Sequence, residues 1–132
     1  MSLKLIESTK NPVAQEMRAL QGAKGRKSGG SFLIEGEKLC AEALKAGLAI
    51  ETALILSGFE GSEPARALCA RAKAAYAVHG RVLEAVAETK SPQPLLCSAR
   101  IPQAGQVTLP LVALDGVQDP GNAGAILRSA DA

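Results

Sequence analysis

The residues best suited to chemistry stand together between Asp115 and Arg128. An apolar run, 109–114, precedes a polar turn at 119–122, and a helical pattern follows the turn. Glycines between a strand and a helix let the backbone approach a ligand, and the N–H groups of a helix N-terminus attract anions. The turn matches neither GxGxxG nor the GxxxxGK[ST] phosphate loop, so a plain strand-to-helix connection explains it equally well.

Arg128 lies opposite the apolar stripe of this helical pattern, which is formed by Ala123, Ile126, Leu127 and Ala130. Because Arg128 stands in the second turn, its side chain could reach back toward the polar turn. The alternative is a surface arginine paired with Asp131, three residues further along the helix.

The other reactive side chains are scattered. Cys40, Cys69 and Cys97 form no CxxC pair and lie in apolar stretches, so we expect buried free thiols rather than a zinc or redox site. His79 has no cysteine, aspartate or second histidine at ligand spacing. We expect it at the end of a strand, and we expect no metal site.

Basic residues gather near the N-terminus. Residues 1–30 hold six Lys or Arg against two Glu, a charge of +4, whereas residues 31–132 hold nine basic and eleven acidic groups, a charge of −2. Such asymmetry favours a polyanionic partner at one end of the chain. The candidate contacts are Arg18, Lys24, Arg26 and Lys27, the last three in a glycine-rich segment, 22–30, that we interpret as a loop. A solvated loop without a ligand is the alternative.

Helical and strand patterns alternate along the chain, which indicates an α/β fold with a largely parallel sheet. Asn11 and Pro12 form a favoured helix start. We expect helices at 11–21, 37–47, 63–73 and 81–88 and strands at 31–36, 50–56, 74–80 and 94–102. Residues 1–102 would thus form a small layered α/β/α domain.

A polar segment, 103–108, reads as a linker, and residues 109–132 as one strand, one turn and one helix. A single βα unit cannot bury both faces of its strand, so we expect one whole domain followed by the first piece of another. No run approaches the roughly 18 apolar residues of a membrane span. No signal peptide is recognisable either, so we expect a cytoplasmic protein without membrane contact.

The C-terminal residues resemble the first signature motif of the SpoU, or TrmH-type, RNA ribose 2′-O-methyltransferases of the SPOUT superfamily. That motif reads Asp-x-Val-x-Asp-Pro-x-Asn-x-Gly-x-Ile-x-Arg-x-Ala after an apolar strand. The matching residues are Asp115, Val117, Asp119, Pro120, Asn122, Gly124, Ile126, Arg128 and Ala130. Ser129 stands where the family often has threonine, which keeps the hydroxyl.

The N-terminal part resembles the substrate-binding domain that precedes the catalytic domain in many SpoU members. The shared features are Ser-x-x-Asn-Pro, a Lys-x-Arg loop, and Phe-x-x-Glu-Gly before a helix. The matching residues are Ser8, Asn11, Pro12, Lys24, Arg26, Phe32, Glu35 and Gly36. This domain shares its fold with small ribosomal proteins of the kink-turn type.

The resemblance implies a knotted catalytic domain that binds S-adenosylmethionine, modifies rRNA or tRNA, and acts as a homodimer when full length. It assigns catalysis to Arg128, which would help activate the ribose 2′-hydroxyl, and to Asn122, which would shape the site. The family's two later motifs, which grip the cofactor, have no counterpart before Ala132. We therefore expect no cofactor-binding residue within this chain, and an N-terminal fragment that is inactive alone.

Two other functions remain open. A stand-alone RNA-binding module of the kink-turn ribosomal type would have no use for the motif with Asn122 and Arg128. A small-molecule α/β binding domain would leave the basic segment at 22–30 unexplained.

Overall fold

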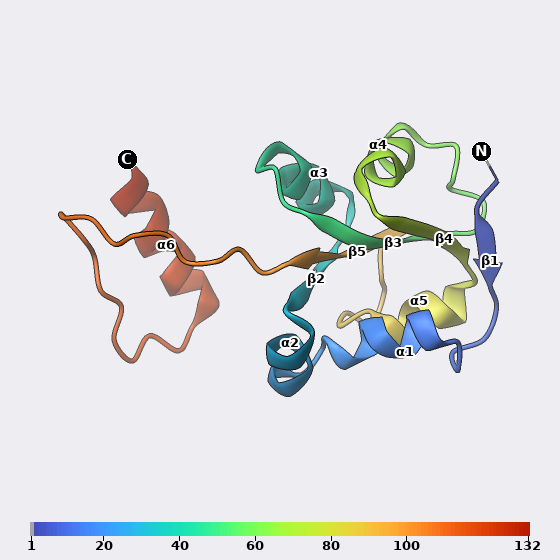
Figure 1. Ribbon diagram of the computed structural model, residues 1–132, viewed down its shortest axis with the longest axis horizontal. Coiled ribbons are helices and arrows are strands. Elements are labelled where there is room, and N and C mark those ends of the chain that lie inside the picture. The colour runs from blue at the N-terminus through green and yellow to red at the C-terminus, as the bar shows by residue number, and fades with distance from the viewer. Residues whose placement is uncertain (1) are drawn as a thin grey trace. The chain divides into compact units, whose positions relative to one another are not determined.

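The computed structural model describes residues 2–132 and divides the chain into two units, one up to Pro102 and one from Gln103. The first unit contains a five-stranded sheet with the strand order β1-β4-β3-β5-β2 (Figure 1). The strands are β1 (Lys4–Ile6), β2 (Ser31–Glu35), β3 (Ile50–Leu56), β4 (Ala74–Val78) and β5 (Leu95–Arg100).

Five helices accompany this sheet: α1 (Pro12–Ala19), α2 (Ala23–Gly29), α3 (Glu37–Lys45), α4 (Glu63–Arg71) and α5 (Gly80–Val86). Figure 1 shows α3 and α4 over one face of the sheet and α1 and α5 over the other. The predicted α/β/α layering is therefore confirmed.

Side chains alternate between the two faces along each central strand, as the pleat of a strand requires. On β3, Ile55 packs with Leu68 of α4, whereas its neighbour Leu54 packs with Met17 of α1 and Leu83 of α5. All four of these leucine and isoleucine side chains are 0–1% exposed. The sheet thus has a separate apolar core on each face.

The sheet is mixed, so the expectation of a largely parallel sheet is wrong. Strand β4 runs parallel to β1 and β3, but β5 runs antiparallel to both β3 and β2. The short helix α5 is followed by an irregular segment, 87–94, which brings the chain back so that Leu95 pairs with Ile55 near the carboxyl end of β3. Strand β5 therefore begins at the same end of the sheet at which β4 ends, and runs in the opposite direction.

Local caps set several helix ends as the sequence predicts. The side chain of Asn11 accepts a hydrogen bond from the Val13 N–H at 2.9 Å, and Pro12 occupies the first helical position of α1. Gly47 follows α3 with a φ of +71°, a left-handed conformation that suits glycine.

The basic segment 22–30 is not a loop, because residues 23–29 form helix α2. Glycine disfavours a helix, and α2 forms although it contains Gly25 and Gly29. A Cβ on Gly25 would lie 1.9 Å from the Ala19 carbonyl oxygen, so at this one position α2 lies too close to the end of α1 for any side chain. Gly30 then ends α2 with a φ of +67°.

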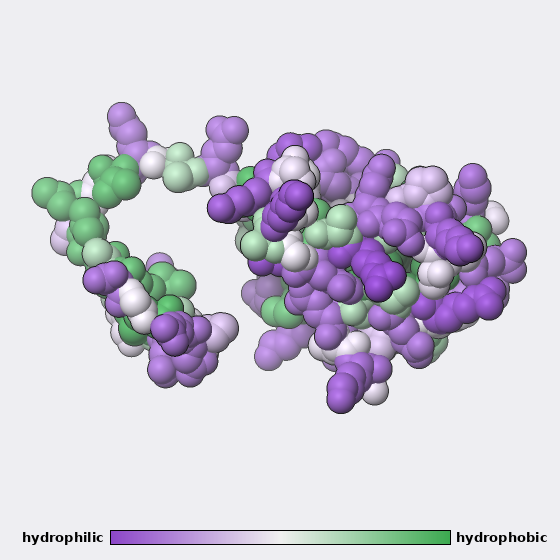
Figure 2. Space-filling view, turned by 90° about the horizontal axis from the view of Figure 1, so that it is seen from below, coloured by the Kyte–Doolittle hydropathy of each residue, from purple (hydrophilic) through white to green (hydrophobic). Residues whose placement is uncertain are grey.

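The second unit has one regular element, helix α6 (Pro120–Asp131), whose first turn is capped by Asp119 accepting from the Gly121 N–H at 3.0 Å. The predicted strand at 109–114 is not formed. An isolated strand has no neighbour to pair its backbone groups. Within the described residues this stretch has no such partner, and the large apolar side chains from Val107 to Val117 are 40–84% exposed. In Figure 2, the hydrophobic colour gathers over this unit.

Candidate functional site

Three basic side chains stand exposed where α1 meets α2. Arg18 lies in the last turn of α1, and Lys24 and Lys27 lie on α2. We call these three residues the basic corner. Of the four basic residues singled out in the sequence, the structure thus leaves three facing solvent.

The fourth, Arg26, is half-buried and bound to the protein itself. Its Nη1 atom donates to the carbonyl oxygens of Leu20 at 3.1 Å and Gln21 at 2.8 Å. These carbonyls belong to the C-terminal end of α1, where helix carbonyls lack intrahelical partners and a cation is favoured. Arg26 therefore joins α2 to α1, a structural role that the Lys-x-Arg pattern did not reveal.

A pocket of about 380 Å³ opens beside the basic corner. Five elements contribute to it, and its lining residues include Glu16 and Met17 of α1, Leu20 directly after α1, Ser28 of α2, Ser31 of β2, Glu51 and Thr52 of β3, and Ser98 and Arg100 of β5. Sequence reasoning missed this pocket, because residues from five separate segments meet only when the sheet order is known.

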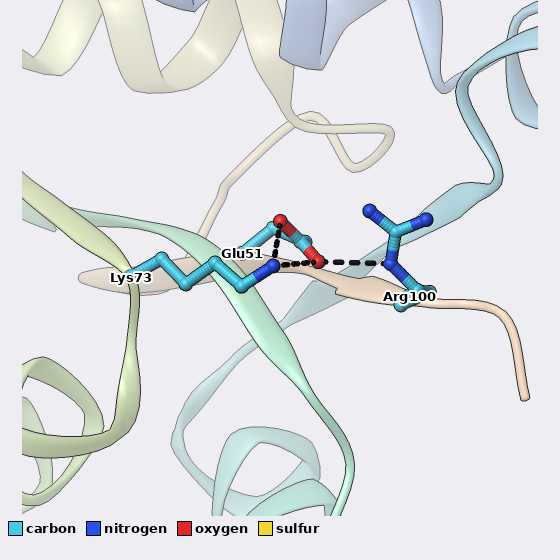
Figure 3. A network of polar contacts seen from close by, with 3 residues as sticks. All are labelled: Glu51, Lys73 and Arg100. Atoms are coloured by element: carbon cyan, nitrogen blue, oxygen red, sulfur yellow. Dashed lines mark hydrogen bonds and ion pairs between the residues drawn. The ribbon is translucent and has the colours of Figure 1, made fainter.

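At one side of the pocket, Glu51 binds two cations, Lys73 directly before β4 and Arg100 of β5 (Figure 3). Its Oε1 accepts from Lys73 Nζ at 2.9 Å and from Arg100 Nε at 3.0 Å, and its Oε2 accepts from Lys73 Nζ at 3.0 Å. The hydrogen bond from Lys73, joined by that from Arg100 and by both positive charges, outweighs desolvation and lowers the pKa of the Glu51 carboxyl below its ordinary value.

The two residues with predicted catalytic roles both lie on α6. Arg128 turns back along the helix, and its Nε donates to the Gly124 carbonyl oxygen at 3.5 Å. No ion pair joins it to Asp131 within residues 2–132, so the alternative of a paired surface arginine is not what the structure shows. Asn122 is exposed and borders an open hollow with Gly116, Val117 and Ile126.

The remaining candidates do not form a reactive site. Cys40 and Cys97 are buried free thiols, with 3.8 Å between their sulfurs, and Cys69 is half-buried. His79 directly follows β4, as predicted, and its Nε2 lies 3.2 Å from Glu7 Oε1. The described part of the chain contains no cluster of three metal-ligating side chains, and none of its helices is long and apolar enough to cross a membrane.

Comparison with known proteins identifies the first unit. Residues 11–97 match the family model described as the MRM3-like substrate binding domain. Two curated relatives match nearly the whole chain. An uncharacterised tRNA/rRNA methyltransferase of Synechocystis is 34% identical over 96% of the chain and 48% of the relative. The 23S rRNA (guanosine(2553)-2′-O)-methyltransferase RlmP of Bacillus subtilis is 35% identical over 98% of the chain and 51% of the relative.

Similar solved structures are also RNA methyltransferases. A crystal structure of an RNA 2′-O ribose methyltransferase matches 96% of this chain and 51% of its own at 34% identity, with a TM-score of 0.72. An AdoMet-bound rRNA methyltransferase from Sinorhizobium meliloti matches 97% of this chain and 50% of its own at 29% identity, with a TM-score of 0.71. The chain spans about half the length of the curated relatives it matches.

Proposed function

The chain belongs to the family of MRM3-like substrate-binding domains found in SpoU/TrmH-type RNA methyltransferases, and on this basis we propose that it recognises RNA for ribose 2′-O-methylation. The first unit would bind the RNA, and residues 109–132 would begin the catalytic domain, with 103–108 as a linker. The observation on which this proposal depends is the basic corner, which lies inside the matched residues 11–97.

RNA binding is assigned to Arg18, Lys24 and Lys27. These side chains are exposed, and they come from the last turn of α1 and from α2, which Arg26 binds to the end of α1. Phosphates bound by such a group release counterions, and the affinity falls as salt rises. Arg26 contributes by holding α2 in place rather than by facing the RNA.

Catalysis is assigned to Arg128 and Asn122. A ribose hydroxyl is a poor nucleophile at neutral pH, and a nearby cation stabilises the negative charge that develops on its oxygen. Arg128 is suited to that task because its guanidinium turns back toward the start of α6, where Asn122 is exposed. The amide of Asn122 would orient the ribose.

S-adenosylmethionine is the methyl donor in this proposal, supported by the AdoMet-bound relative. The residues of this chain do not fit it by themselves. The hollow beside Asn122 is bordered by a single helix and the turn before it, whereas ligand sites of this size are walled on several sides. The cofactor site, the knotted domain, the homodimer and a cytoplasmic location therefore belong to the proposal for the whole protein.

Methyl transfer provides the direct test. The whole protein, incubated with radiolabelled S-adenosylmethionine and rRNA or tRNA, should label the RNA, and nuclease digestion should place the label on the ribose 2′-oxygen. Label on a base would overturn the assigned chemistry. RNA binding without any transfer would instead favour the stand-alone RNA-binding module.

A further inference from the structure

We propose that the pocket beside the basic corner, here named the base pocket, accepts one unstacked nucleobase of the bound RNA. This inference rests on the proposed RNA binding and adds the kind of RNA that the site selects. At about 380 Å³, the base pocket is at the small end of ligand pockets and has room for a single base.

The lining of the base pocket combines an apolar wall with hydrogen-bonding groups. Met17 and Leu20 supply the apolar wall. The two buried polar residues among residues 2–132 are Ser31 and Ser98, 7% and 4% exposed, and both line this pocket. Thr52 adds a third hydroxyl. Sites for flat ligands typically have this character, with apolar walls and a few polar groups that fix the orientation.

The charges of the base pocket favour a base over a phosphate in its interior. Glu16 and Glu51 both line it, and a carboxylate repels a phosphate. All four RNA bases carry N–H donors, which carboxylate and hydroxyl oxygens accept. Since Lys73 and Arg100 bind Glu51, these three side chains together carry a charge of +1, which balances the charge of Glu16, so the pocket as a whole does not repel the RNA backbone outside it.

Arg100 forms one side of the base pocket. Its Nε is fixed by Glu51, and Figure 3 shows its two terminal nitrogens turned away from the carboxylate. The side chain is 57% exposed, so more than half of it is accessible to a ligand. Unstacked RNA bases characteristically stack on arginine planes. Glu51 thus acts as a positioning residue for this stacking surface.

The base pocket lies next to the basic corner along the same two helices. Glu16 and Met17, which line it, adjoin Arg18, and Gly25 and Ser28, which also line it, adjoin Lys24 and Lys27. RNA bound through its phosphates at the basic corner would therefore pass the pocket. A base in a duplex stays stacked and paired, so only an unpaired nucleotide could enter.

The test compares a fluorescently labelled 12-nucleotide single-stranded RNA with the duplex formed by the same strand and its complement, using anisotropy and the whole 132-residue chain. Thr52→Phe fills the base pocket, and Thr52→Val is the matched control that keeps the volume of the side chain. We expect Thr52→Phe to weaken single-strand binding by about 5- to 150-fold, the loss of one stacked base, and to leave duplex binding unchanged. Thr52→Val removes one of the three hydroxyls without filling the pocket, so it should weaken single-strand binding much less than Thr52→Phe does.

A second substitution, at the exposed residue Arg100, keeps the test valid if the Thr52→Phe variant does not fold. Arg100→Gln removes the stacking plane, and Arg71→Gln removes an equal charge at an exposed position of α4. We expect Arg100→Gln alone to reduce the preference for single strands. Equal effects of the two changes, or wild-type single-strand binding by a folded Thr52→Phe variant, would overturn the base pocket. If the base pocket were overturned but alanine substitutions at the basic corner still abolished RNA binding, the proposed RNA recognition would hold without the base pocket.

Discussion

The guanidinium of Arg26 donates a 2.8 Å hydrogen bond to the main-chain carbonyl of Gln21. The side chain of Gln21 in turn donates from Nε2 to the Val86 carbonyl oxygen at 2.7 Å, at the end of α5. One arginine on α2 is thus connected to the C-terminal ends of two other helices. Arg26 therefore has a structural role, whereas the exposed residues of the basic corner are the ones available to a ligand.

Replacing Arg26 with alanine should therefore destabilise the fold. The change leaves two helix-end carbonyls without their donor, and hydrogen bonds from a charged group contribute about 1.5–3 kcal/mol. Urea denaturation followed by circular dichroism measures the free energy of unfolding. Lys27→Ala, next to it and exposed, is the control and should change stability by less than about 0.5 kcal/mol. Equal stability of both variants would remove the structural role of Arg26.

Replacing Arg18, Lys24 and Lys27 together with alanine should weaken RNA binding and flatten its salt dependence. Each lost phosphate contact lowers the slope of log K against log salt by roughly 0.7–0.9. Filter binding at several salt concentrations measures that slope. A triple variant at Lys38, Arg66 and Arg71, all exposed on α3 and α4, removes the same charge elsewhere. Identical slopes for the two triple variants would show that the basic corner is only solvated.

Glu51 should make stability depend on pH in a defined direction. Its folded pKa lies below the ordinary value because Lys73 and Arg100 stabilise the carboxylate. The folded state therefore binds this proton less tightly than the unfolded state, and the stabilisation is present above the unfolded pKa and is lost as pH falls through the folded one. Wild type should exceed Glu51→Gln in stability at pH 7, and the difference should shrink toward pH 3. An unchanged difference in urea denaturation at both pH values would contradict this assignment.

Replacing Arg128 with alanine in the whole protein should lower kcat by roughly a hundredfold or more, since one charge-stabilising donor is lost at the reacting oxygen. Single-turnover methylation assays measure this step, and cofactor binding should change little. Arg128→Lys tests whether charge alone suffices. Near-normal turnover of the alanine variant would exclude Arg128 from the mechanism.

The 132-residue chain alone should neither bind S-adenosylmethionine nor methylate RNA. Its hollow beside Asn122 is open and bordered by one short region of the chain, so it cannot enclose a nucleoside-sized ligand. Isothermal titration calorimetry with the cofactor measures the binding. Micromolar affinity would mean that these residues form a complete site.

Sequence patterns predicted those elements that depend on local signals. The cap at Asn11, the stop at Gly47 and the apolar run of β3 each lie within a few residues, and the structure has all three. The patterns failed for elements whose structure depends on contacts between residues far apart in the sequence. Helix α2 is bound to the end of α1 through Arg26, and the direction of β5 depends on the segment before it. The strand expected at 109–114 has no partner among the described residues.

The residues of the candidate site were likewise predicted only where a local signal marks them. The sequence singled out Arg18, Lys24 and Lys27 by their charge, and the structure leaves them exposed. It could not separate Arg26 from them, because the bonds to Leu20 and Gln21 form only when α2 turns back on α1.

The close approach of Gly25 to Ala19 also bears on how variation in this protein should be interpreted. Even an alanine at position 25 would place its Cβ 1.9 Å from a main-chain oxygen, which cannot move aside without opening the junction of α1 and α2. In a saturation library selected for soluble expression alone, position 25 should retain only glycine, while positions 24 and 27 accept many residues. Adding a selection for RNA binding should then restrict positions 24 and 27 to basic residues. A position 25 that accepts only glycine would thus indicate a packing constraint. Positions 24 and 27 that accept only basic residues would indicate RNA binding.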